Sequence, residues 1–214
     1  MSNHSQNAYG FMALCPLKDE IGLDQSPEAR LRDLLNDLPQ HEQSPMAAVP
    51  NTYLCRFFVL GDVVYQGKPA ELDHLKSKYL VFVAEIHAPD EAAVDEYLRL
   101  MWVKAGGGTF VPTTFQYGVG FESVNDPDKF VKYMRRCQVD TTLYFNGSTD
   151  EPLAEQLKAL YLKQEFSKFV YETQGLPPAA LQDAFQGFIA RVRPNEALPT
   201  WRPGASSLTN AVIQ

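Results

Sequence analysis

Residues 78–102 read KYLVFVAEIHAPDEAAVDEYLRLMW, and this segment sets the architecture expected of the chain. From Tyr79 to Ile86 nearly every side chain is apolar, aromatic or β-branched, which is typical of a strand covered on at least one face. After the break at Ala88-Pro89-Asp90, apolar side chains recur at helical spacing: Val94, Tyr97, Leu98 and Met101. The pattern predicts a strand over 78–87 that leads directly into a helix over 91–102, and it contains no recognisable catalytic motif.

Two further strands and a helix are expected on the N-terminal side of this unit. The runs YGFMALCPL (9–17) and NTYLCRFFVLGDVV (51–64) have strand composition. The second run is apolar on both alternating faces, which predicts a central strand. Between them, 24–38 is expected to be a helix, with Ser26 as N-cap and Pro27 at the first helical position.

The sequence after residue 104 is less regular. AGGG at 105–108 favours a flexible joint, because no lysine-serine ending of phosphate-loop type follows it. Segment 109–121 has strand composition interrupted by Pro112 and Gly118, which suits an edge strand or an extended loop and could supply the last strand of the sheet. Another short strand is expected at 139–145. Helices are expected over 126–136, 151–172 and 177–192. The stretch from 193 to 214 has no periodicity and is expected to form an extended tail.

This order of elements predicts an α+β fold: a ferredoxin-like antiparallel sheet with packed helices and a helical C-terminal extension. The expected organisation is a ferredoxin-like unit over 9–121, a short β-α-β and two-helix extension over 122–192, and the tail. The order of elements over 9–121 resembles that of the dimeric α/β-barrel superfamily, in which two such units close their sheets into a barrel. That superfamily includes antibiotic-biosynthesis-type monooxygenases and haem peroxidases. The resemblance implies a homodimer but no particular function.

Composition excludes several classes of partner. The net charge of −7 comes without a basic stripe, so nucleic-acid binding is not expected. No apolar run reaches the roughly 20 residues of a membrane span. The start MSNHSQNAYG has neither a basic nor an apolar segment of signal-peptide type, so a cytoplasmic location is expected.

Cysteine and histidine spacing indicates neither a disulfide framework nor a metal site. The three cysteines, Cys15, Cys55 and Cys137, are far apart in sequence and form no CxxC pair. No HExxH or HxH motif occurs either, and no metal site is expected.

Positive charge is concentrated in one place, at Lys129, Lys132, Arg135 and Arg136. Their spacing is interpreted as the solvated face of a short helix rather than as an anion site.

Six residues are candidates for contacting a small ligand: Arg56, Tyr53, His87, Glu85, Tyr117 and Tyr144. Arg56 is a charge within an aromatic strand, where its guanidinium either reaches solvent or recognises a carboxylate bidentately. Glu85 on the neighbouring strand is an alternative partner for it. His87 closes a strand, where sites are often assembled, although the position favours a surface or capping histidine over a ligand or general base. The tyrosines could orient a small apolar ligand through single hydrogen bonds.

The resemblance also raises haem as a cofactor. His87 or His74 would be the axial ligand, and Arg56 the distal group. The GxxDG signature of dye-decolourising peroxidases is absent, however, and Leu60-Gly61-Asp62 has the wrong spacing. The sequence therefore favours a protein without haem.

Three hypotheses about function remain. The favoured one is a protein that holds a small, mostly apolar ligand in a sheet-lined cavity, as a homodimer. The second is an oxygenase or haem-peroxidase-like enzyme. The third is a protein-interaction module that docks through its helical C-terminal third and proline-rich tail.

Overall fold

The computed structural model describes residues 3–19, 25–63, 67–68, 74–196 and 200–205, and it divides the chain into two units. Unit 1 covers residues 1–150 and unit 2 residues 151–214. The predicted boundary at 121–122 falls inside unit 1, because the helix that follows it packs on the helix and strand of the first part.

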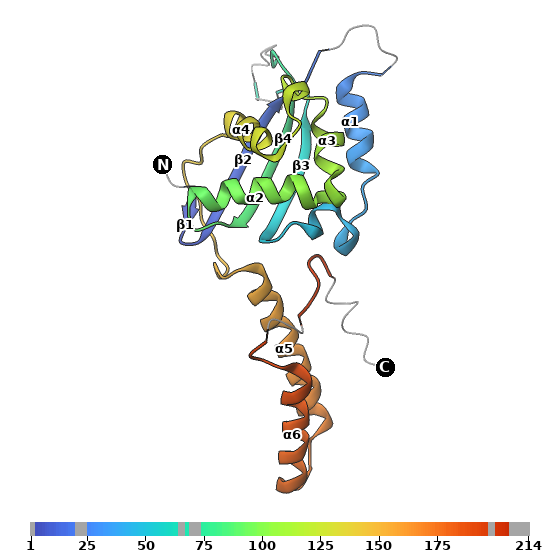
Figure 1. Ribbon diagram of the computed structural model, residues 1–214, viewed down its shortest axis with the longest axis vertical. Helices are drawn as coiled ribbons and strands as arrows, with labels where there is room; N and C mark the ends of the chain where they lie inside the picture. Colours follow the sequence, from blue (N-terminus) through green and yellow to red (C-terminus); the bar gives the residue numbers. More distant parts are fainter. Residues whose placement is uncertain (1–2, 20–24, 64–66, 69–73, 197–199, 206–214) are drawn as a thin grey trace. The chain divides into compact units, whose positions relative to one another are not determined.

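Unit 1 is built on a four-stranded antiparallel sheet. The strands are β1 (His4–Ser5), β2 (Ala8–Pro16), β3 (Thr52–Leu60) and β4 (Tyr79–His87), and they lie in the order β1-β2-β4-β3 (Figure 1). Because β4 lies between β2 and β3, the segment from β2 to β3 forms the split β-α-β arrangement of ferredoxin-like sheets. The predicted α+β class, with an antiparallel sheet and packed helices, is confirmed.

Four helices belong to this unit. They are α1 (Pro27–Asn36), α2 (Glu91–Lys104), α3 (Phe110–Phe115) and α4 (Pro127–Cys137). Short 3-10 turns lie at His41–Gln43, Pro45–Ala48, Ala105–Gly108 and Phe121–Ser123. The side chains of Ser26, Asp90 and Asp126 accept hydrogen bonds from backbone N–H groups at the starts of α1, α2 and α4, as N-caps do. The predicted N-cap of α1 is confirmed.

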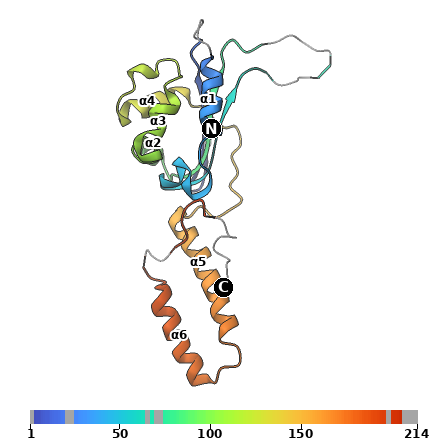
Figure 2. The same ribbon diagram turned by 90° about the vertical axis from the view of Figure 1, so that its right-hand side faces the viewer.

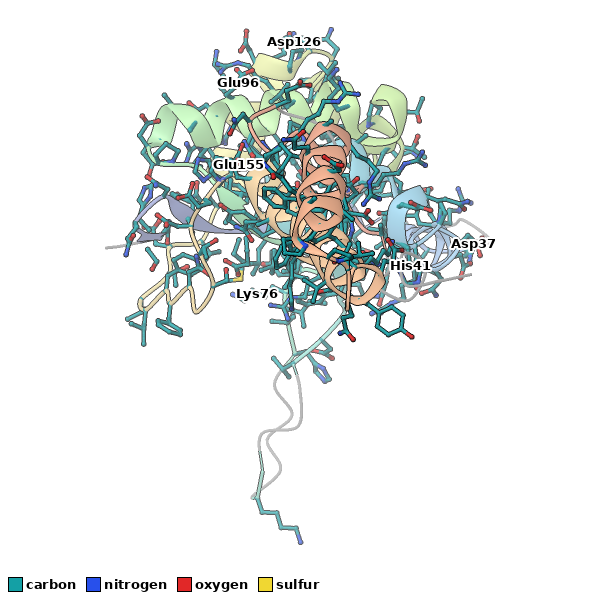
Figure 3. All side chains as sticks on the ribbon, turned by 90° about the horizontal axis from the view of Figure 1, so that it is seen from below. Asp37, His41, Lys76, Glu96, Asp126 and Glu155 are labelled. Carbon is teal, nitrogen blue, oxygen red and sulfur yellow. The ribbon has the colours of Figure 1, made fainter. Side chains whose placement is uncertain are left out.

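Helices α2, α3 and α4 cover one face of the sheet (Figure 2). Alternate residues of β2 and β4 point into this side and are buried, and they form the main core with the helices. The largest fully buried core side chains are Tyr9, Phe11, Phe82, Phe115, Phe130, Leu31, Leu80, Ile86, Leu98, Met101, Met134 and Val49. Figure 3 shows Glu96 of α2 and Asp126 on the outer side of these helices, away from the sheet.

The opposite face of the sheet is only partly covered. Segment 139–150 runs along this side of the sheet (Figure 2), and a Cβ at Gly10 of β2 would touch the ring of Tyr144. Leu54, Arg56 and Phe58 of β3 point to this face and are exposed. The prediction of β3 as a central strand was therefore wrong: β3 is an edge strand, and its second apolar face is not covered within unit 1.

The edge strand or extended loop predicted at 109–121 was also wrong. Gly106 and Gly107 adopt left-handed backbone angles that turn the chain sharply after α2. The next residues form α3, whose buried side chains follow helical spacing: Phe110, Val111, Thr114 and Phe115. Beyond the four strands, single antiparallel bridges join Ala13 to Gln138 and Leu17 to Gly118.

Segment 139–145 is irregular rather than the predicted strand. Its first residue, Val139, donates a backbone hydrogen bond to Met12 at 2.9 Å, and no strand ladder follows it in the described residues.

Unit 2 is an antiparallel helical hairpin of α5 (Leu153–Glu172) and α6 (Pro178–Val192), close to the predicted helices. Phe169, Phe188 and Val192 form its small core. The buried carboxylate of Glu165 accepts hydrogen bonds from Lys168 and Arg191, at 2.8 and 2.6 Å. Large apolar side chains remain exposed, including Tyr171 at 80%. A docking role for this hairpin stays a prediction, and the tail predicted beyond it lies partly outside the described residues.

Candidate functional site

Four of the six predicted site residues lie together at one end of the uncovered sheet face. The Tyr53 hydroxyl is 3.1 Å from His87 Nδ1, and the same nitrogen is 2.9 Å from the backbone carbonyl oxygen of Asp150. Because a carbonyl can only accept, Nδ1 carries the proton in this contact. The Tyr144 hydroxyl lies near Glu85, and burial together with this neighbouring carboxylate raises the pKa of Tyr144.

This cluster holds segment 139–150 against the sheet. Asp150 is fixed twice: its carbonyl contacts His87, and its carboxylate accepts a hydrogen bond from the Asn7 backbone at 2.9 Å. Tyr144 covers Gly10 on the neighbouring strand. The polar groups of the cluster therefore bind segment 139–150, so their role in this structure is to hold that segment in place.

The other two predicted site residues lie outside the cluster. Arg56 is exposed on β3, and no salt bridge joins it to Glu85 in the described part of the chain, although both side chains point to the same face. Tyr117 packs against the main core, and its carbonyl accepts a hydrogen bond from the Lys18 backbone beyond the far end of β2. The structure thus does not gather all six residues into one ligand site.

A pocket of about 600 Å³ lies instead at the β2 edge of unit 1. Leu14, Pro16 and Tyr79 line it from the sheet face that the helices leave uncovered. Its remaining lining comes from the loop before α4 and from α4: Val119, Gly120, Ser123, Val124, Lys129, Lys132, Tyr133, Arg136 and Cys137. The volume is within the range of about 300–1,000 Å³ that is typical of small-molecule sites.

Among the residues that the structure describes, the lining is largely apolar and contains three cations and no carboxylate. Lys129, Lys132 and Arg136 follow one another at i, i+3 and i+7, which places them on one face of α4. Lys129 contacts Asn125 at 2.7 Å and Asp126 at 3.6 Å. Lys132 and Arg136 have no salt bridge within the described ranges. The interpretation of these three residues as only a solvated helix face was incomplete, because they also border a pocket.

Arg135, the fourth member of the predicted basic cluster, has a different role. Its guanidinium donates to Asp95 at 2.7 Å, to the Glu91 carboxylate at 2.8 Å and to the Glu91 carbonyl at 2.9 Å. A fourth bond, of 2.9 Å, goes to Gln138, whose amide donates to the Tyr9 hydroxyl at 2.7 Å. These bonds join α4 to α2 and β2, so Arg135 is a structural residue.

Tyr133 and Cys137 form the polar side of the pocket nearest the core. The Tyr133 hydroxyl is buried and has no well-formed hydrogen bond in the described structure. A Cβ at Gly118 would overlap it, so glycine is required there by close approach. Burial and the neighbouring thiols of Cys15 and Cys137 raise the pKa of Tyr133.

The pocket does not fit the haem hypothesis. Its lining contains no histidine. His74 lies instead in an exposed loop, with Nδ1 2.7 Å from the Asp62 carboxylate, and Nδ1 of His87 is engaged with Asp150. The two histidines considered as axial ligands therefore do not lie at this pocket.

Few other features point to a function. No group of three or more potential metal ligands lies together among the described residues. None of the described helices combines the length and the apolarity that a bilayer span needs. The chain matches no protein-family model, no curated protein and no solved structure.

Proposed function

We propose that the protein binds a small amphipathic anion, an apolar body carrying a carboxylate, in the pocket between β2 and α4. The observation that carries this proposal is the lining itself, in which an apolar floor is bordered by three cations and, within the described ranges of the chain, by no acidic side chain. The sequence predicted a mostly apolar ligand in a sheet-lined cavity, and the present proposal moves that ligand to the sheet edge and adds a charge to it.

Electrostatics supports an anion over a neutral ligand. The chain carries a net charge of −7, yet Lys129, Lys132 and Arg136 converge on one opening. An anion seated there would pair with Lys132 and Arg136, which have no salt bridge within the described residues. Pairs of this exposure contribute about 0.5 kcal/mol each. Two such pairs correspond to roughly a fivefold gain in affinity.

The test compares two probes of the same shape, 1-naphthoate and its neutral amide 1-naphthamide. Both are titrated into isotope-labelled full-length protein and followed by amide chemical shifts. Naphthoate is expected to bind about fivefold more tightly. Shifts are expected in α4 and at Tyr79. In the double variant Lys132→Gln/Arg136→Gln the two probes should bind equally, whereas Arg30→Gln, at an exposed position on α1, should keep the difference. Equal affinities in the unmodified protein, or shifts confined to other elements, would refute the proposal.

A second candidate role, homodimerisation, is favoured by a different observation. On the uncovered sheet face, Leu54 is 56% exposed and Phe58 is 44% exposed, with Arg56 between them. Glu85 lies on the same face, and one of its carboxylate oxygens is buried without a hydrogen bond. A two-fold symmetric partner would cover the apolar groups and bring Arg56 of one copy toward Glu85 of the other.

Sedimentation velocity tests this second role. A dimer is expected at micromolar concentration, and Phe58→Arg should convert it to a monomer. Val103→Arg is the matched control, because Val103 is also exposed but lies on α2, on the other side of the sheet. A monomeric unmodified protein, or equal effects of the two variants, would count against an interface on this face.

A further inference from the structure

Two of the three cysteines lie side by side in the fold, although 121 residues separate them in the sequence. Cys15 is on β2 and faces the helix-covered side, and Cys137 is the last residue of α4. The end of α4 is fixed beside β2 by the bridge between Ala13 and Gln138 and by the hydrogen bond from Val139 to Met12. Each of the two thiols also shifts the pKa of the other, as neighbouring groups do.

The two sulfurs differ in their access to solvent. Cys137 is partly exposed and lines the pocket, whereas Cys15 is completely buried. A small oxidant that enters the pocket therefore meets Cys137 first, with Cys15 directly behind it. The third cysteine, Cys55, is on β3, where its neighbour across the sheet is Ala84 of β4.

The surroundings of Cys137 favour its thiolate. The hydrogen bond from Cys15, the Tyr133 hydroxyl and the charge of Arg136 lower the pKa of Cys137, while burial acts in the opposite direction. Burial alone raises the pKa of Cys55 to about 11. Because the thiolate is the reactive form, Cys137 is expected to be more reactive than Cys55 at neutral pH.

We infer that Cys137 is a hydroperoxide-reactive thiol and that Cys15 resolves it to a reversible disulfide joining β2 to α4. In the first step the Cys137 thiolate attacks one oxygen of the hydroperoxide; an S–O bond forms, the O–O bond breaks, and the alkoxide or hydroxide leaves and takes up a proton. In the second step the Cys15 sulfur attacks the Cys137 sulfenic sulfur, an S–S bond forms, and the hydroxyl group leaves as water with the proton from Cys15. The two thiols are oxidised by two electrons and the peroxide is reduced.

The buried position of Cys15 is compatible with this order of events. The largest cause of its raised pKa is its hydrogen bond with Cys137. Once Cys137 has become a sulfenic acid, it no longer carries a thiolate, and this cause is removed. Burial continues to raise the pKa of Cys15, so removal of this cause eases its deprotonation only in part. This chemistry does not depend on whether the pocket binds an amphipathic anion.

The experiment exposes the folded full-length chain to one equivalent of hydrogen peroxide and measures intact mass and digested peptides. The expected product lacks two hydrogen atoms, contains a Cys15–Cys137 peptide pair, and returns to the starting mass with dithiothreitol. Cys55→Ser is the control and should give the same product. In Cys15→Ser, Cys137 should stop at a sulfenic acid that dimedone labels.

A second measurement keeps the inference testable if one of these variants misfolds. Iodoacetamide labelling of the unmodified protein at pH 7 should modify Cys137 at least about tenfold faster than Cys55, since a higher thiolate fraction outweighs lower intrinsic nucleophilicity. Three intact thiols after peroxide treatment, a disulfide that includes Cys55, or faster labelling of Cys55 would overturn the inference.

Discussion

Replacing Arg135 by methionine should destabilise unit 1 by about 2–3 kcal/mol, since hydrogen bonds from charged donors contribute about 1.5–3 kcal/mol each when buried. The side chain makes four such bonds and is 23% exposed. Its acceptors Asp95 and Glu91 are more exposed, so they regain water when the guanidinium is lost. The estimate is therefore well below the sum of four buried bonds. Methionine keeps the apolar stem and the helix propensity of the position.

The assay is urea unfolding followed by the fluorescence of Trp102, in a Trp201→Phe background. Trp102 lies on α2 and packs against Phe130 of α4 at 5.5 Å between ring centroids, so it reports on the helix pair that Arg135 joins. With a typical slope of about 2 kcal/mol per molar urea, the midpoint should fall by roughly 1 M.

The matched control is Arg136→Met, one position further along the same helix. Arg136 is exposed and has no salt bridge in the described residues, so its replacement should change the free energy of unfolding by less than about 0.5 kcal/mol. Equal losses in the two variants, or no loss in Arg135→Met, would show that the reasoning from these hydrogen bonds is wrong.

Three further predictions concern local contacts of unit 1. Ser26→Ala removes the N-cap bond of α1 and should cost about 1 kcal/mol in the same urea assay; an unchanged midpoint would contradict the cap. Lys78 is the largest cause of the lowered pKa of Glu28, so the stability from this pair is present above pH 4.5, the ordinary pKa of that carboxyl, and is lost as the pH falls further. Glu28→Gln should flatten that acid loss in urea titrations, and an unchanged pH profile would argue against it. Gly118→Ala should lower the free energy of unfolding of unit 1, because the added methyl group overlaps the Tyr133 hydroxyl. Removing that hydroxyl in the double variant Gly118→Ala/Tyr133→Phe should recover part of the lost stability. No recovery would exclude this clash as the cause.

Much of the fold could be predicted because its signals are local. The apolar runs of β2 and β4, the N-cap of α1, and the helical spacing of α2 and α6 are each contained in about 10–20 neighbouring residues. The strand predicted at 109–121 failed for a physical reason. Its aromatic and β-branched composition suits a strand, but the left-handed backbone of Gly106 and Gly107 turns the chain into a helix whose apolar face meets the core.

The position of β3 could not be predicted from its apolar pattern. A strand with two apolar faces can be buried on both faces or can expose one of them, and the residues themselves do not distinguish the two cases. Leu54 and Phe58 are exposed on such a face within unit 1.

The candidate pocket was harder to predict than the fold, because its lining comes from β2, β4, the loop before α4 and α4 itself. One signal was present: Lys129, Lys132 and Arg136 share a helix face, whereas Arg135 does not. The sequence could not show that an apolar floor lies beside that face. Nor could it show that Cys15 and Cys137 meet, since tertiary folding alone brings them together.

The pairing of β2 with β4 also has a consequence for how the chain acquires its structure. Ala8 pairs with His87 and Pro16 with Tyr79, so the first long strand of the protein has its partner in a much later segment. Closing a loop of roughly sixty to eighty residues costs chain entropy before any pairing energy is gained. Folding of unit 1 is therefore expected to be slow compared with that of the local helical hairpin α5–α6. During synthesis on the ribosome, β2 leaves the exit tunnel well before β4 has been synthesised. The apolar side chains of β2 therefore have no strand partner during that interval.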